Sequence, residues 1–99
     1  MNKWMIFLAS VIAAASAHAQ PSDLQARNLA ASCSACHGTN GAAAPGMVAL
    51  AGYDRASMIK AMADFKSGAR PATLMHQLSK GYSEAQIEAM ANYFAAQKK

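Results

Sequence analysis

The sequence is poor in cysteine, in acidic residues and in segments that alternate apolar with polar residues. Of its 99 residues only two are Cys and five are Asp or Glu, against nine Lys or Arg. Two cysteines are too few for a disulfide framework, and the missing alternation argues against a sheet. The basic residues form no run and are not interleaved with aromatic residues, so nucleic-acid binding is poorly supported. The length allows one small domain.

The one long apolar run lies at the N-terminus. Lys3 precedes "WMIFLASVIAAA", and the small residues Ala-His-Ala follow at 17–19. This pattern is typical of a cleaved secretory signal, and the run is shorter than the roughly 20 residues that a spanning helix needs. We therefore expect a signal peptide at 1–19 and a single periplasmic domain at 20–99, with no membrane span in the mature chain. An uncleaved anchor is the alternative, and it would hold the same domain at a membrane.

Three segments after the signal have helical spacing. Capping boxes beginning at Ser22 and Ser83 open the first and the last helix, and Asp54 caps the middle one, which ends at Gly68. Apolar residues on the middle and last helices recur at i, i+3, i+4 and i+7, which indicates core-facing stripes. The intervening segments are rich in glycine and have no sustained period. The sequence therefore predicts an all-α fold whose long loops wrap around another body.

The stretch "CSACH" from Cys33 to His37 carries the clearest chemical signal. Structural zinc needs four ligands, and a redox disulfide uses a thiol at a helix N-terminus after a strand, whereas these cysteines follow a predicted helix. In an exported chain, C-x-x-C-H is the attachment signal of covalent haem c. Cys33 and Cys36 would each bond one vinyl group, and His37 would ligate the iron. We predict one haem c, with zinc and thiol chemistry as the alternatives.

A haem iron held by His37 needs a second axial ligand or keeps an open position, and the choice sets its potential. Met75 lies in a glycine-bounded segment between the last two helices, and we expect its thioether to be this ligand. His76 is its rival, although we expect it to face solvent. We also expect the carbonyl of Pro45 to accept the ring N–H of His37. The remaining methionines after the predicted signal either belong to apolar stripes or lie too close to His37: Met47, Met58, Met62 and Met90.

The segments "CSACHGTNG", "LAGYD", "MADFKSGAR" and "TLMHQLSKGYSEAQIEAMANYFAAQ" resemble class I cytochromes c. They are most similar to the haem domains of the cytochrome subunit of flavocytochrome c sulfide dehydrogenase. The resemblance implies a class I cytochrome c fold, with three main helices and glycine-rich loops around one haem. It also implies thioethers at Cys33 and Cys36 and axial ligation by His37 and Met75.

The same resemblance implies a function in periplasmic electron transfer rather than catalysis. The partner would be a flavoprotein subunit that oxidises sulfide, forming a heterodimer with this chain, or another redox protein. The alternatives are a free diffusible carrier and, from another class, a haem enzyme or sensor with a labile sixth ligand. The chain departs from the group in two ways, because Val48 stands where a second proline is frequent and only one C-x-x-C-H motif is present.

Overall fold

The computed structural model describes residues 22–99, so the predicted signal peptide at 1–19 lies outside it. Within that range the elements are α1 (Asp23–Ala31), α2 (Ser34–His37), the 3₁₀ helix η1 (Thr39–Gly41), α3 (Arg55–Ser67), α4 (Met75–Leu78), the 3₁₀ helix η2 (Ser79–Gly81) and α5 (Glu84–Ala95). The described part of the chain contains no strand, which confirms the predicted all-α fold. No helix in this part is both long and apolar enough to cross a membrane.

The predicted caps are present. The Ser22 hydroxyl accepts a hydrogen bond from the backbone N–H of Gln25, whose side chain accepts one from the Ser22 N–H, and an equivalent pair opens α5 at Ser83. The Asp54 carboxylate caps α3, which ends at Gly68 with a left-handed φ of +81°. These three helix boundaries were predicted because capping depends on residue types at fixed short spacing.

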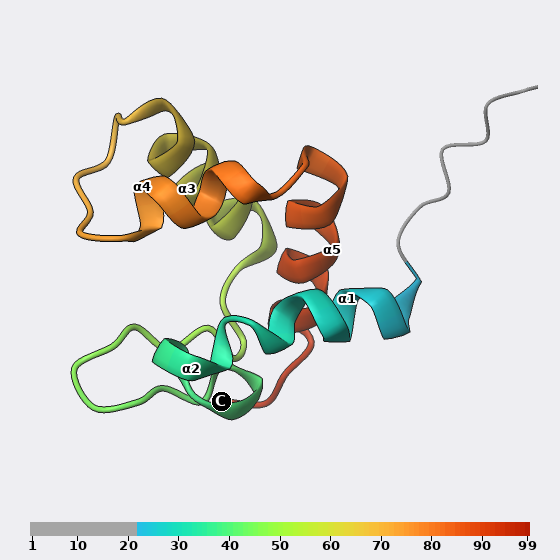
Figure 1. Ribbon diagram of the computed structural model, residues 1–99. Coiled ribbons are helices and arrows are strands. Elements are labelled where there is room, and N and C mark those ends of the chain that lie inside the picture. The colour runs from blue at the N-terminus through green and yellow to red at the C-terminus, as the bar shows by residue number, and fades with distance from the viewer. Residues whose placement is uncertain (1–21) are drawn as a thin grey trace, which may run out of the picture.

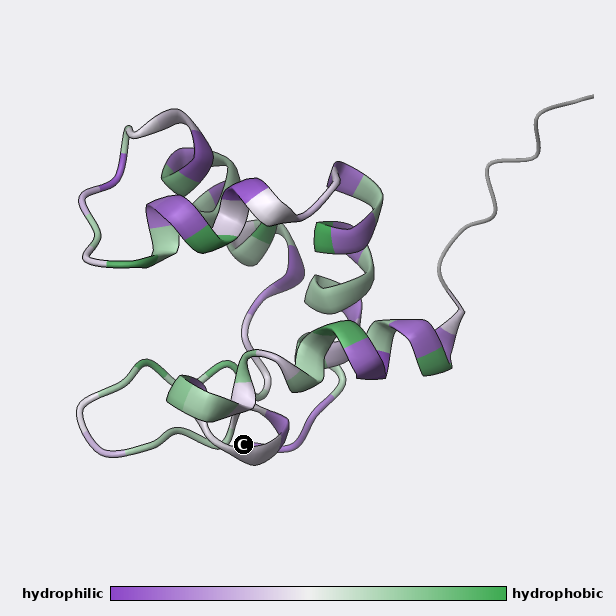
Figure 2. Cartoon of the chain, in the orientation of Figure 1, coloured by the Kyte–Doolittle hydropathy of each residue, from purple (hydrophilic) through white to green (hydrophobic). Residues whose placement is uncertain are grey.

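The core lies where α1 and α3 both pack against α5 (Figure 1). Its buried members come from these three helices: Ala30, Met58, Ile87, Met90, Ala91 and Phe94. Figure 2 shows that these helices mix apolar and polar residues, as expected for helices that bury one side only. Phe94 and Ser79 are the largest side chains that are fully buried in residues 22–99. A core this thin leaves little margin for folding on its own.

The two segments singled out for cofactor binding lie on different arms of the molecule. In Figure 1, α2, η1 and the loop 42–50 form one arm, and α3 and α4 form the other. The short segment from Leu50 to Asp54 joins the arms, and α4 packs on α3. His37 therefore ends an element of one arm, whereas Met75 begins an element of the other.

Candidate haem site

Cys33, Cys36 and His37 share one helical turn. The backbone N–H groups of Cys36 and His37 both point to the carbonyl oxygen of Cys33, at 3.3 and 2.9 Å. Residues at i, i+3 and i+4 lie on the same side of such a turn. Both thiols are free, with Cys33 half-buried against the core and Cys36 exposed. The turn thus offers two sulfur atoms and an imidazole on one side.

The His37 ring is held in one tautomer. Its Nδ1 lies 2.6 Å from the carbonyl oxygen of Val48, and since a carbonyl can only accept, Nδ1 carries the proton. In the neutral ring with this tautomer the lone pair is on Nε2, which is the arrangement that a metal ligand needs. The backbone of His37 is held as well, because its carbonyl accepts the Ala43 N–H at 2.8 Å.

The expectation that Pro45 supplies the acceptor for His37 is wrong. Pro45 and Gly46 are the central residues of an exposed turn, which the Met47 N–H closes by donating to the Ala44 carbonyl at 3.0 Å. Gly46 has φ +79°, so Pro45 and Gly46 fit positions i+1 and i+2 of a type II turn. The residue that reaches His37 is Val48, three positions further on, in the return of the loop.

Two glycines let the loop 42–50 fold back against α2 and the core. A Cβ on Gly38 would lie 3.0 Å from the carbonyl carbon of Ala43, and one on Gly41 would lie 2.8 Å from the Ala51 nitrogen. Gly41 also accepts backbone hydrogen bonds from Leu50 and Ala51, at 2.8 and 2.9 Å. Because both glycines have positive φ, these approaches require residues without a Cβ.

The thiol environment does not suit thiol–disulfide exchange. Burial raises the pKa of the Cys33 thiol, the hydrogen bond from Ser32 lowers it by less, and the neighbouring Cys36 raises it further. Redox-active cysteines instead have a lowered thiol pKa. Among residues 22–99, no three His, Cys, Asp or Glu side chains cluster as they would around a metal ion held by protein alone. The donor set instead fits a haem that brings four nitrogen ligands of its own.

The second ligand segment contains an unpaired buried atom. Met75 begins α4 and is half-buried, as is its neighbour His76. We expected His76 to face solvent, but its Nδ1 is buried and has no hydrogen-bond partner among the described residues. Buried polar atoms are nearly always paired, and this nitrogen beside the proposed ligand is an exception. This side of the site also fits a bound haem.

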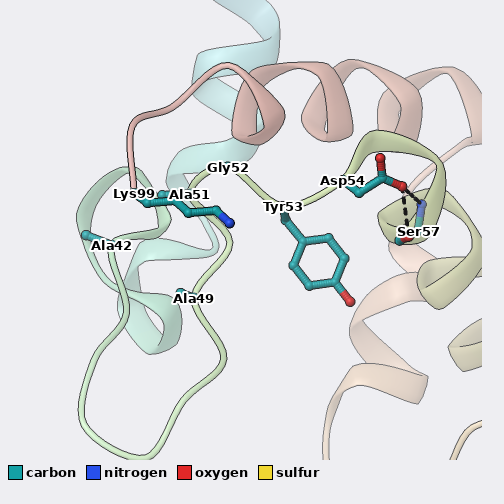
Figure 3. A pocket seen from close by; sticks show the side chains of 8 residues that line it. All are labelled: Ala42, Ala49, Ala51, Gly52, Tyr53, Asp54, Ser57 and Lys99. Atoms are coloured by element: carbon teal, nitrogen blue, oxygen red, sulfur yellow. Dashed lines mark hydrogen bonds between the residues drawn. The ribbon is translucent and has the colours of Figure 1, made fainter.

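A pocket of about 570 Å³ adjoins the His37 loop (Figure 3). It is lined by small and polar residues of the loop, of the start of α3 and of the C-terminal end: Ala42, Ala49, Ala51, Gly52, Tyr53, Asp54, Ser57 and Lys99. Sequence reasoning did not find Lys99, because no pattern links it to a loop some fifty residues earlier.

No family model matches the chain. It is 36% identical over 66 residues to the cytochrome subunit of sulfide dehydrogenase from Chlorobaculum tepidum, covering 67% of this chain and 60% of that protein. It is 35% identical over 100 residues to cytochrome c4 from Pseudomonas aeruginosa, covering 99% of this chain and 50% of that protein. The thiosulfate dehydrogenase electron acceptor of Stutzerimonas stutzeri is 38% identical over 64 residues, which cover 63% of this chain and 30% of that protein. The chain spans about half the length of the curated relatives it matches.

Proposed function

We propose that this chain, a class I cytochrome c and an electron-transfer protein by its fold and its relatives, carries one covalent haem c with His37 and Met75 as axial ligands. The observation that carries the proposal is the 2.6 Å hydrogen bond from His37 Nδ1 to the Val48 carbonyl, on the same turn as both free thiols. It presents Nε2 as a ligand beside two attachment points. Bound there, the haem supplies the one-electron redox step.

Cys33 and Cys36 would be the thioether anchors. Each thiol would add its S–H across the C=C bond of a vinyl group of the haem, with sulfur bonding one carbon and hydrogen the other. The addition needs no oxidant and releases no leaving group, but it does need reduced thiols, and both cysteines are free. Their separation by three positions on one helical turn suits two anchors on one side of a flat ring.

Met75 is proposed as the sixth ligand because of its position in the fold. It begins α4, which packs on α3 in the arm opposite to the arm that carries His37 (Figure 1). A thioether ligand stabilises the reduced iron and raises the potential, which suits an electron carrier. It also fills the coordination site, so that the haem enzyme or sensor with a labile sixth ligand is the less favoured alternative.

The proposed partner is a sulfide-oxidising flavoprotein, with this chain as its cytochrome subunit in the periplasm. The similarity to the cytochrome subunit of sulfide dehydrogenase supports this choice. So do large apolar side chains that stay exposed on the loop 42–50 and on the segment 74–78, which contains α4: Met47, Val48, Leu74 and Leu78. We call these four residues the apolar rim. Exposed apolar residues that gather near one site commonly mark a docking surface.

A free diffusible carrier is the second candidate. The match to a protein named as the electron acceptor of thiosulfate dehydrogenase favours it. The two candidates differ in the lifetime of the complex, since a subunit co-purifies with its flavoprotein in a stable heterodimer and a carrier dissociates from its donor.

The first test is the absorption spectrum of the exported protein, recorded oxidised and reduced and extended into the near infrared. We expect haem that resists extraction after denaturation, and a sulfur-to-iron band that is lost in Met75→Ala. Met47→Ala is the matched control, because Met47 is exposed on the loop and should keep the band. Extractable haem, or a band that survives Met75→Ala, would refute the proposed attachment or the proposed ligand.

A further inference from the structure

The pocket beside the His37 loop contains two polar groups that the proposed iron ligation does not use. Three alanines form the loop side of its wall, and Tyr53 and Lys99 stand on opposite sides of the opening (Figure 3). In the same view the Lys99 side chain extends across the pocket, and its ammonium group points toward Tyr53. The wall therefore combines an apolar surface with one cation and one phenol.

The position of Lys99 is set by packing against the backbone. A Cβ on Gly52, whose φ is +68°, would lie only 2.8 Å from Cγ of Lys99. The Gly52 N–H donates to the Phe94 carbonyl at 2.8 Å, and the Gln97 N–H donates to the same oxygen at 3.1 Å. These bonds tie the end of the chain to the loop, so the Lys99 side chain lies across Gly52.

The charge of Lys99 has no acidic partner in the described residues. Asp54 is the one acidic side chain that lines the pocket, and its carboxylate accepts from the N–H and the hydroxyl of Ser57, at 2.9 and 2.8 Å. The single ion pair among residues 22–99 joins Lys60 to Asp64, on α3. The pocket therefore holds an ammonium that forms no direct ion pair, together with one carboxylate, Asp54, whose hydrogen bonds go to Ser57.

Tyr53 also differs from the other two tyrosines. The Tyr93 hydroxyl donates to the Asn40 side chain at 2.6 Å, and the Tyr82 hydroxyl shares a hydrogen bond with Ser32 at 2.7 Å. The Tyr53 hydroxyl has no hydrogen-bond partner among residues 22–99. A half-buried phenol without a partner is a free donor.

We propose that this pocket receives the carboxylates of the bound haem, its propionates, with the Lys99 ammonium as their cationic partner and the Tyr53 hydroxyl as a second donor. The proposal rests on the proposed function, since it requires a haem on His37. The wall residues Ala42 and Ala49 belong to the loop whose Val48 carbonyl orients His37, so the pocket adjoins the loop that holds the proposed iron ligand. An ammonium and a phenol are suitable partners for carboxylates.

The pairing has a defined electrostatic consequence. A cation beside a propionate favours its ionised form, so Lys99 lowers the propionate pKa. The positive charge of Lys99 also destabilises the oxidised iron, which carries one more positive charge than the reduced iron. Lys99 therefore raises the midpoint potential. Asp54 is the other charged side chain at the pocket. Its negative charge raises the propionate pKa and lowers the midpoint potential, and its side chain is exposed.

The test compares Lys99→Met with Lys98→Met in the exported, haem-loaded protein. Methionine keeps the alkyl packing on Gly52 and removes the charge, and the control removes the same charge from Lys98, which is exposed as Lys99 is but does not line the pocket. We expect Lys99→Met to lower the midpoint potential more than Lys98→Met. It should also raise the propionate pKa, so that the midpoint potential changes with pH over a higher pH range. Added salt should reduce both differences. Lys99→Arg should restore the parent behaviour.

A second pair of variants tests the phenol. Tyr53→Phe should shift the pH range over which the midpoint potential changes to higher pH. Tyr82→Phe, which loses only its hydrogen bond to Ser32, should leave that range unchanged. If Lys99→Met and Tyr53→Phe both match their controls in a protein with covalent haem and the near-infrared band, this inference is overturned and the proposed function stands. A parent protein without covalent haem would instead overturn the proposed function.

Discussion

The ring Nδ1 of His37 and the carbonyl oxygen of Val48 are 2.6 Å apart, and their hydrogen bond joins α2 to the return of the loop 42–50. A side chain that ligates a metal commonly has its other nitrogen fixed in this way, because the bond sets the tautomer and the direction of the ring. The loop therefore acts on the proposed iron ligand through its backbone, and changes that move the loop should move the ligand.

The close approach at Gly41 gives the first prediction. Gly41→Ala should destabilise the haem-loaded protein by about 3 kcal/mol, because it combines a positive φ with a Cβ only 2.8 Å from the Ala51 nitrogen. Gly46→Ala is the control, since its φ is similarly positive but nothing lies within 4 Å, and it should cost about 1 kcal/mol. Urea unfolding followed by haem absorption measures both. Equal losses would show that backbone conformation alone matters.

The cysteines give the second prediction. The double variant Cys33→Ser/Cys36→Ser should prevent covalent attachment and leave the chain largely unfolded. The reason is that Phe94 is the one large apolar side chain that is fully buried in the described residues. Far-ultraviolet circular dichroism of the purified variant should show most of the helical signal lost. A variant that keeps its full helicity without haem would show that the packing of α1 and α3 on α5 is sufficient.

The cap of α3 gives a prediction about pH. Hydrogen bonds from the Ser57 hydroxyl and N–H lower the pKa of the Asp54 carboxyl below its usual value. A lowered pKa in the folded state adds stability above the unfolded-state pKa, and this stability is lost as pH falls through the folded-state pKa. Asp54→Asn should therefore reduce stability at neutral pH and weaken its decline in acid. Glu88→Gln removes a charge from the exposed side of α5 and should leave that decline unchanged.

The apolar rim gives a prediction about binding. Met47→Asp and Leu78→Asp place a charge on side chains of the apolar rim that are 43% and 52% exposed and take no part in the proposed ligation, so they should leave the haem spectrum and folding intact. If the rim contacts the flavoprotein, each should weaken the complex by about tenfold or more in Kd, measured by calorimetry or co-purification. Leu24→Asp, on α1 and 66% exposed, is the control. Equal binding by all three variants would place the docking surface elsewhere.

Much of the fold was predictable because it depends on local spacing. The capping boxes at Ser22 and Ser83, the Asp54 cap and the Gly68 stop are set by residues within a few positions of each other. The apolar stripe of α5 was predictable for the same reason, since a helix places those residues on one side whatever it packs against.

The site was predictable in its side chains but not in its backbone contacts. The His37 acceptor is a main-chain carbonyl, and any residue can supply one, so the identity of Pro45 misled the prediction and Val48 gave no signal. The burial of His76 Nδ1 depends on how α4 packs, and the place of Lys99 depends on how the end of the chain meets Gly52. Such contacts arise only when segments distant in sequence come together.

The thin core also affects the stability of the chain before haem is attached. With few large side chains fully buried in the described residues, the free chain should open readily and be cut by proteases. Loading with haem and closure around it would then be a single event. A chain that fails to acquire its cofactor would be degraded rather than accumulate, so the amount of intact protein in the cell should report how well haem attachment is working.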